Sequence, residues 1–221
     1  MHLNLIMMIE QLGRYFLAAA LLLCCQKDIA QGKRMKHGKD LPLALGAYYF
    51  DGWTEGSHHI TSLLKDSFPE REPIWGWVTS KPEVMKKQID AAADAGVRFF
   101  SFDWYYREGA DNISLNNALR LYREAPNKRR LQFCLMVANH KPYVVTPQSW
   151  KTVAATWINL FRDPGYVRVN DKPLLIFFSV SSLVQEFGTA GAVRQALDSL
   201  RQAAANEGLK GVTMAVCVGP S

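Results

Sequence analysis

The chain has 221 residues, of which 48% are hydrophobic and 21% are charged, a composition typical of a globular protein with one sizeable core. The formal net charge is +6, but 20 basic and 17 acidic residues remain from Leu41 onward, a charge of only +3. Much of the basic character therefore lies in the first 40 residues. It gives little support to a nucleic-acid partner, and we expect none.

The N-terminal segment predicts export. Arg14 precedes the apolar run 15–25, "YFLAAALLLCC", which is too short to span a bilayer but suits a signal peptide. Its end, "LLCC", resembles a bacterial lipobox, so we expect Cys25 to carry lipid, with Cys24 as the alternative and a plain secretory signal as the other interpretation. Residues 1–25 are thus a lipoprotein-type signal peptide, and 26–40 a flexible basic tether. The expected location is the periplasm, or the outer membrane or surface of a bacterium, with membrane contact only through the lipid.

The folded domain is expected over 41–221, beginning with a strand at 41–50 buried on both faces. A loop over 51–79 follows. The segment 80–96 then predicts a helix in which Ser80 and Glu83 form a capping box. Gly96 is expected to end this helix in left-handed geometry.

Strand and helix patterns alternate along the rest of the chain. The predicted elements are strands at 97–106 and 130–139, a helix at 114–125, a helix opened by Thr146-Pro147, a short strand at 166–169, a turn at Asn170-Asp171, a strand at 174–179, a helix at 190–206 and a strand at 212–219. Trp150, Trp157 and Phe161 recur at helical spacing in the helix opened by Thr146-Pro147, which indicates a core stripe without chemistry. Cys134 and Cys217 lie in apolar strands and are expected to be free thiols, and no Cys/His spacing matches a metal site.

Repeated strand–helix units predict an α/β fold with a parallel sheet, either doubly wound or a (β/α)8 barrel of the TIM type. No glycine-rich phosphate loop follows the first strand, which weakens the nucleotide-binding alternative. Polar and aromatic residues gather at strand ends, where barrel enzymes place their sites. We therefore expect a barrel truncated after about five β/α units.

The residues at these strand ends suit a carbohydrate, because aromatic rings cover the CH faces of sugars while polar groups bind the hydroxyls. The candidate binding residues are Tyr48, Tyr49, Trp53, Glu55, Trp104, Tyr105, Tyr106 and Asn139. The candidate catalytic residues are Asp103, Asp51 and His140. Trp75 and Trp77 are either a sugar platform or part of the loop core.

Alternation along the second strand sharpens the role of Asp103. Phe99, Ser101, Asp103 and Tyr105 share one face, and the aromatic residues between them share the other. The face with the serine suits a barrel interior, so Asp103 is expected to point into the barrel mouth. The alternative is that Asp103 only binds backbone amides at the end of the strand.

Several segments together resemble the glycoside hydrolase 71/99-like proteins, including the WbsX-like glycosyltransferases. The resemblance rests on "GAYYFDGW", "PIWGW", "QIDAAADAGVRFFSFDWYY", "FCLMVANH" and "FRDPGYVRVNDKPLLIFF". It implies a (β/α)8 barrel acting on glycans, often mannose-containing, without a metal or other cofactor. It also implies a glutamate after the third strand, where this chain has His140, and principal catalytic carboxylates on strands beyond those present.

The leading hypothesis is therefore a glycoside hydrolase that uses carboxyl groups as acid and base. The alternatives are a glycan-binding protein without turnover and a glycosyltransferase of surface-polysaccharide assembly. All three take a glycan or polysaccharide as partner.

Overall fold

The computed structural model describes residues 44–110 and 112–217, which belong to a compact unit spanning Leu43–Ser221. The predicted signal peptide, its lipid acceptor Cys25 and the basic tether lie outside the described residues. Among the helices that are described, none is long and apolar enough to cross a membrane.

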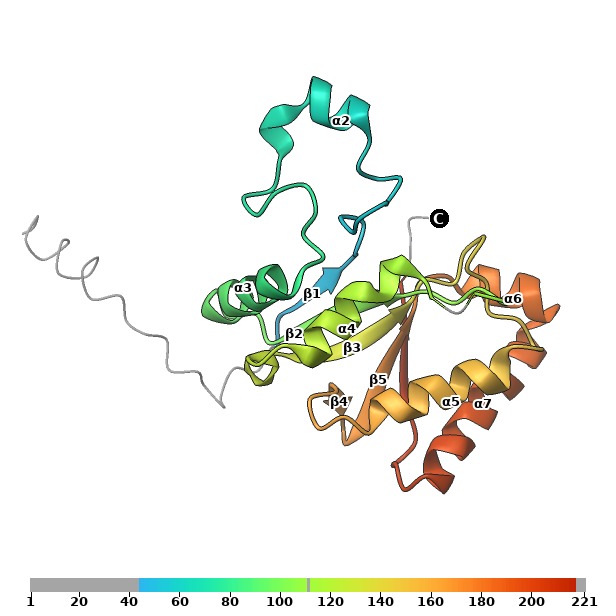
Figure 1. Ribbon diagram of the computed structural model, residues 1–221. Coiled ribbons are helices and arrows are strands. Elements are labelled where there is room, and N and C mark those ends of the chain that lie inside the picture. Colours follow the sequence, from blue (N-terminus) through green and yellow to red (C-terminus); the bar gives the residue numbers. More distant parts are fainter. Residues whose placement is uncertain (1–43, 111, 218–221) are drawn as a thin grey trace, which may run out of the picture. The chain divides into compact units, whose positions relative to one another are not determined.

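A six-stranded sheet forms the centre of the domain (Figure 1). Its strands are β1 (Gly46–Tyr49), β2 (Phe99–Trp104), β3 (Gln132–Val137), β4 (Arg168–Val169), β5 (Lys172–Phe177) and β6 (Thr213–Val216). β1, β2, β3, β5 and β6 pair in this order and run parallel. The short β4 forms an antiparallel hairpin with β5.

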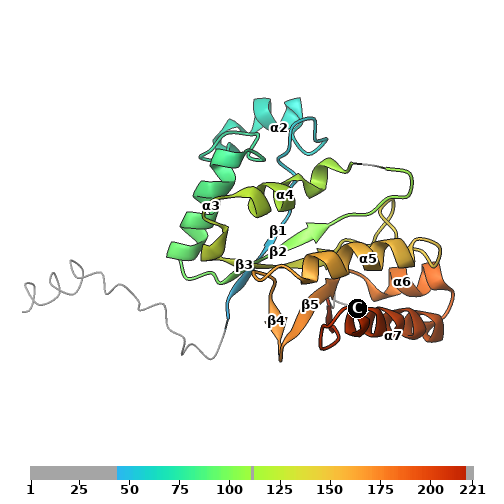
Figure 2. The same ribbon diagram turned by 60° about the horizontal axis from the view of Figure 1, so that its bottom comes forward.

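Helices connect the parallel strands. They are α2 (Ser62–Ser67), α3 (Pro82–Asp94), α4 (Asn117–Glu124), α5 (Trp150–Phe161), α6 (Val180–Phe187) and α7 (Ala190–Asn206), with short 3-10 turns at Pro69–Arg71, Ser114–Asn116 and Lys128–Arg130. Figure 2 shows α3 beside α4, and α5 near α6 and α7. The apolar stripe of each long helix is buried against the sheet.

The strand order distinguishes the two predicted architectures. A doubly wound sheet reverses its strand order at a switch point, whereas a barrel adds each parallel strand beside the preceding one. Here every parallel strand is added on the same side, from β1 to β6, without reversal. The described domain therefore has the α/β fold and the winding of a (β/α) barrel, as predicted.

One face of the sheet carries the main core. Phe102 and Phe133 pack against Tyr122 of α4, while Trp104 and Phe177 pack against Trp157 of α5. Trp157 is fully buried and also contacts the ring of Trp150, so the predicted aromatic stripe of α5 is confirmed as core.

We call the opposite face of the sheet the inner face; its residues include Tyr48, Ser101, Asp103, Cys134, Met136 and Cys217. The phenol oxygen of Tyr48 on β1 lies 3.8 Å from the sulfur of Cys217, which directly follows β6. Side chains from the first and last strands of the sheet thus meet on this side. The predicted alternation along β2 is confirmed, since Asp103 shares this face with Ser101 while Phe102 lies against the helices.

Three local predictions are wrong. The strand at 41–50 is not buried on both faces, because β1 is an edge strand and Leu45 and Tyr48 are exposed. Ser80 does not cap α3; the cap position is Lys81, without a side-chain bond, and the Ser80 hydroxyl donates to Asp51 instead. Pro147 does not open α5, which begins at Trp150.

Other local predictions are confirmed. Gly96 has a φ of +89° after α3, and Asn170 and Asp171 both take left-handed conformations in the turn between β4 and β5. The helix predicted at 190–206 is α7. The sequence pattern missed α6, whose first turn is capped by the Ser179 hydroxyl, and it missed α2 in the loop after β1.

Candidate functional site

Asp103 lies near the C-terminal end of β2 on the inner face and is the best candidate for acid/base chemistry. Its Oδ1 atom is buried and has no hydrogen-bond partner among the described residues. Burial raises the pKa of Asp103 to about 6, and the charge of His140 partly opposes this shift. A carboxyl group with such a pKa exchanges protons readily near neutral pH, as an acid/base catalyst must.

Tyr48 and two sulfur atoms lie on the same face. Tyr48 is 65% exposed, and its hydroxyl approaches the Cys217 sulfur, which in turn lies 3.5 Å from the sulfur of Met136. The hydroxyl of Ser101 is buried and also lacks a partner within the described part of the chain. An exposed phenol ring beside unpaired oxygens of Ser101 and Asp103 could bind the ring and hydroxyl groups of a sugar.

An aromatic cluster surrounds His140 at the ends of β2, β3 and β5. The imidazole meets the rings of Tyr105, Tyr143 and Phe178 edge to face, with centroid distances of 6.3, 6.1 and 5.6 Å. Tyr105 and Tyr143 also contact each other at 4.9 Å. Burial raises the pKa of the Tyr105 phenol above its usual range, with a further contribution from Asp103.

Two asparagines fix the backbone around this cluster. Asn116 accepts a bond from the Tyr105 amide at 2.9 Å and donates to the Tyr105 carbonyl at 2.8 Å. Asn139 accepts from the Ser179 amide at 3.0 Å and donates to the Ser179 carbonyl at 2.6 Å. The Asn139 side chain is therefore occupied in joining the end of β3 to the start of α6, and it is nearly fully buried.

We expect Asn139→Ala to lower the free energy of unfolding by about 2 kcal/mol, because it leaves the amide and carbonyl of Ser179 without their partners. Urea unfolding followed by tryptophan fluorescence measures the change. Asn159→Ala, on the exposed face of α5, is the matched control and is expected to change stability little. Equal stability of the two variants would contradict the role given to Asn139.

The structure does not bring all the predicted residues together. Tyr49 points to the helix side of the sheet, where its hydroxyl donates to Gln88 of α3 at 2.6 Å. Asp51 is buried and accepts bonds from the Ala118 amide at 2.7 Å and from the Ser80 hydroxyl at 3.0 Å. It thus caps α4, and burial raises its pKa while these two bonds lower it. Neither Tyr49 nor Asp51 lies on the inner face with Asp103.

The remaining predicted binding residues are also spread out. Trp104 is buried on the helix side and stacks on Tyr106. Trp53 lies in the loop after β1 with its ring 6.3 Å from that of Trp77, and Glu55 in the same loop is exposed. Of the predicted set, Tyr48, Tyr105, His140 and Asp103 are the side chains around the inner face and the aromatic cluster.

Sequence reasoning missed Asn116, Phe178 and Met136. Asn116 gave no signal, because it falls where a helix was predicted and its partner is 11 residues away. Phe178 follows β5 directly, so the strand-end criterion applied elsewhere could have identified it. Met136 sits beside Asp103 in the β2–β3 register, but its apolar type pointed to core.

No cluster of three or more His, Cys, Asp or Glu side chains suited to a metal ion is found within 44–110 and 112–217. The expectation that no metal or cofactor is needed stays a prediction.

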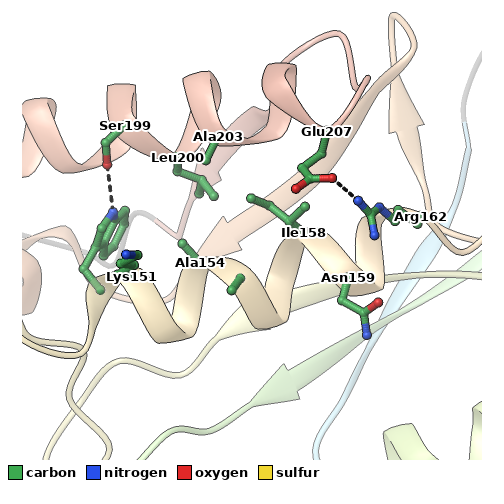
Figure 3. Close-up of a pocket in the computed structure, with 11 residues that line it drawn as sticks. Lys151, Ala154, Ile158, Asn159, Arg162, Ser199, Leu200, Ala203 and Glu207 are labelled. Atoms are coloured by element: carbon green, nitrogen blue, oxygen red, sulfur yellow. Dashed lines mark hydrogen bonds and ion pairs between the residues drawn. The ribbon is translucent and has the colours of Figure 1, made fainter.

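A cavity of about 410 Å³ lies elsewhere, on the helix layer between α5 and α7 (Figure 3). Its floor is apolar and includes Ala154, Ile158, Leu200 and Ala203. Polar groups at its two ends bind each other, through the Trp150 indole and the Ser199 hydroxyl at 3.1 Å and through the Arg162–Glu207 ion pair. Because these polar groups already bind each other, whereas the buried Asp103 oxygen has no partner among the described residues, we place the candidate site around Asp103 and not here.

One family model matches more than half of the chain. The family model described as "Glycosyltransferase WbsX" matches residues 75–218, about two thirds of the chain. No curated protein matches the chain. A solved structure of a GH99 endo-alpha-mannosidase from Bacteroides thetaiotaomicron is similar at 19% identity and a TM-score of 0.39, covering 55% of this chain and 36% of that one.

A second structure of that enzyme, in complex with bis-tris-propane, is similar at 17% identity and a TM-score of 0.43. It covers 67% of this chain and 47% of the other. The chain thus covers between about a third and a half of the length of these two structures.

Proposed function

Because the chain belongs to the family of WbsX glycosyltransferases, we propose that it acts on a glycan at the inner face of its sheet, with Asp103 as the acid/base group. The observation that supports this most directly is the Asp103 carboxyl. It combines a raised pKa with a buried oxygen that no described side chain or backbone group satisfies. A sugar hydroxyl or a glycosidic oxygen is a suitable partner for such an atom.

Glycosidic bond cleavage needs a proton on the leaving oxygen and a second group that activates water or attacks the sugar. A carboxyl group with a pKa of about 6 holds a proton in part of the molecules at mildly acidic pH and can deliver it. Tyr48 supplies an exposed ring beside it for the apolar face of a sugar. Asp51 is not assigned the second role, since its carboxylate already caps α4 from the other side of the sheet.

The description of the family favours a second candidate, glycosyl transfer. In that reaction the ionised form of Asp103 would remove a proton from the acceptor hydroxyl. Hydrolysis and transfer therefore place the same carboxyl group at the reacting oxygen. They differ in whether water or a sugar accepts the glycosyl group.

The test is to incubate the 221-residue protein with mannose-containing oligosaccharides between pH 5 and 7 and to measure both binding, by saturation-transfer NMR, and release of reducing ends. Released sugar supports hydrolysis, and consumption of a sugar nucleotide with an acceptor glycan supports transfer. Binding without turnover, blocked by Tyr48→Ala, supports a glycan-binding site and overturns the catalytic role of Asp103. Neither binding nor turnover across a broad glycan panel overturns the proposal.

A further inference from the structure

We propose that the end of the sheet at which the parallel strands begin is a docking surface for the headgroups of an anionic lipid bilayer. We call this end the basal face; its cations include Arg98, Arg129 and Lys172. The inference goes beyond the lipid contact expected from the sequence. It does not rest on the proposed function, because Asp103 and His140 lie near the other end of the strands.

Positively charged residues lie next to the starts of four parallel strands. Arg98 precedes β2, Arg129 lies in the turn before β3, Lys172 opens β5 and Lys210 precedes β6. Because these strands run parallel, their starts share one end of the sheet. The Arg98 carbonyl also accepts a bond from the Gln132 amide at 2.9 Å, which ties the starts of β2 and β3 together.

The carboxylates near the basal face are largely neutralised by ion pairs. Lys210 binds Asp171 at 2.7 Å. A network on α3 and the turn before β3 contains two cations and two carboxylates, namely Lys86, Asp90, Asp94 and Arg130. Exposed pairs of this kind stabilise a fold little, but their charges cancel locally. The positive charge of the basal face therefore comes from other cations.

Two of these cations have a structural role. Nζ of Lys128 donates to the Arg123 carbonyl at 2.5 Å near the end of α4. The Arg168 guanidinium donates to the carbonyl of Phe161, the last residue of α5, at 2.6 Å. Cations near helix C-termini bind free carbonyls and oppose the helix dipole. The fold alone thus accounts for Lys128 and Arg168, and the inference does not depend on them.

Three cations have no such role. Within 44–110 and 112–217, the side chains of Arg98, Arg129 and Lys172 form no ion pair and no hydrogen bond. Arg129 and Lys172 are exposed, and Arg98 is half-buried. Their charges are therefore available to a partner that presents several negative groups at once.

A cavity of about 520 Å³ opens on the basal face beside Arg129. It lies between the turn before β3 and the segment 163–165, and Lys128 and Gln132 also line it. The carboxylate among its lining residues is Asp163, which accepts a bond from the Gly165 amide at 2.9 Å and lies 4.0 Å from the Arg123 guanidinium. A lipid phosphate that enters this cavity would meet two cationic side chains and an amide donor.

Exposed apolar side chains lie at the same end of the sheet. Leu45 directly precedes β1 and is 56% exposed, and Val169 in the β4–β5 hairpin is 41% exposed. A bilayer interface takes up aliphatic side chains together with Lys and Arg, whereas a nucleic-acid backbone binds only the cations. The described part of the chain also begins here, at Ala44, and the predicted lipid acceptor Cys25 is 19 residues earlier. An anionic bilayer is therefore the partner that fits.

The experiment measures, by sedimentation, how the 221-residue protein partitions onto vesicles of phosphatidylglycerol mixed with phosphatidylcholine and onto phosphatidylcholine alone. In the triple variant Arg98→Gln, Arg129→Gln, Lys172→Gln, the partition coefficient onto the anionic vesicles is expected to fall by about 10- to 100-fold. The reason is that each Lys or Arg near an anionic surface strengthens binding roughly fivefold. Raising the ionic strength should remove the difference.

The matched control removes the same charge elsewhere, through Lys65→Gln, Lys151→Gln and Arg194→Gln on exposed positions of α2, α5 and α7. Its partition coefficient should stay within about twofold of the wild-type value, because charges more than a Debye length from the membrane are screened. The N-terminal segment is identical in all three proteins, so the differences between them come from the folded domain. Circular dichroism verifies that both variants fold.

Equal partition of the folded basal-face variant and its control onto the anionic vesicles overturns the inference. A loss that is equally large on phosphatidylcholine alone also overturns it. Binding to single-stranded RNA that depends on the three cations, without such dependence on the anionic vesicles, assigns the basal face to a nucleic acid instead and overturns it too. Glycan turnover is measured separately, and its absence leaves the vesicle result unchanged.

Discussion

Replacing Asp103 with asparagine is expected to lower the rate of glycan turnover by about 10²- to 10⁴-fold, the usual contribution of one acid/base group. Asparagine has nearly the same size and can still form hydrogen bonds, but it cannot exchange the proton. Glycan affinity is expected to change much less than turnover, because the amide still occupies the inner face. Initial rates of reducing-end release and a binding isotherm for the same glycan measure the two effects.

The matched control for this prediction is Asp198→Asn. Asp198 is exposed on α7, where it pairs with Arg201 at 2.6 Å, far in the fold from the inner face. This variant should keep wild-type turnover. Wild-type turnover in a folded Asp103→Asn protein would mean that another residue transfers the proton.

The same variant has a second readout that needs no substrate. Because the native Asp103 pKa of about 6 exceeds the ordinary value of 3.8, the folded state binds the proton more tightly than the unfolded state. This contribution to stability is fully present below pH 3.8 and is lost as the pH rises through 6. A shift of this size corresponds to about 3 kcal/mol in a fully enclosed site. Solvent screening at this partly open group lowers the expected contribution to about 1–2 kcal/mol.

Asp103→Asn cannot lose a proton, so the difference in unfolding free energy between the variant and wild type should grow from pH 4 to pH 7 in favour of the variant. Using the difference cancels other groups that also titrate, such as Asp51 and Asp90. Urea unfolding at a series of pH values provides it. A constant difference would show that Asp103 is not buried as described.

Trp157→Ala is expected to lower the free energy of unfolding by about 3–5 kcal/mol, the cost of emptying the space of a large aromatic residue in a core. The side chain is fully buried and joins the rings of Trp104, Trp150 and Phe177 at 5.6 to 5.8 Å. Domains of this kind have about 5–15 kcal/mol in total, so the variant should be close to unfolding. Chemical denaturation measured by circular dichroism is the appropriate method.

Trp157→Phe refines the prediction. The indole nitrogen of Trp157 is buried without a hydrogen-bond partner among the described residues, so phenylalanine removes an unsatisfied donor while keeping a ring. Its cost should therefore be smaller, about 1–2 kcal/mol. Trp77→Ala, in the partly exposed loop after β1, is the control and should cost about 1 kcal/mol or less. Equal losses for Trp157→Ala and Trp77→Ala would contradict the central place of Trp157.

The order of strands and helices could be predicted because it depends on patterns of residues that are close together in the sequence. The run 174–179, the turn at Asn170 and Asp171, and the helix at 190–206 each depend on residues close together in sequence. The alternation along β2 also placed Asp103 on the correct face, since side chains of a strand point to opposite sides in turn.

The arrangement of the site could not be predicted to the same extent, because distant contacts decide it. Asp51 binds an amide 67 residues away, and that bond holds its carboxylate at the start of α4. The Ser80 hydroxyl donates a second bond to the same carboxylate and therefore does not cap α3. Tyr49 differs from Tyr48 only by one step along β1, yet that step places the two phenols on opposite faces. A rule that groups all strand-end residues cannot separate them.

The two outer strands of the sheet have a consequence for handling the protein. Within the described residues, β1 pairs only with β2, and β6 pairs only with β5. Each outer strand therefore presents a row of free backbone donors and acceptors, next to exposed Tyr48 on one side and Val216 on the other. Such rows can template strand addition between molecules. The protein should accordingly aggregate more readily as its concentration rises. Light scattering measured during purification would detect this aggregation.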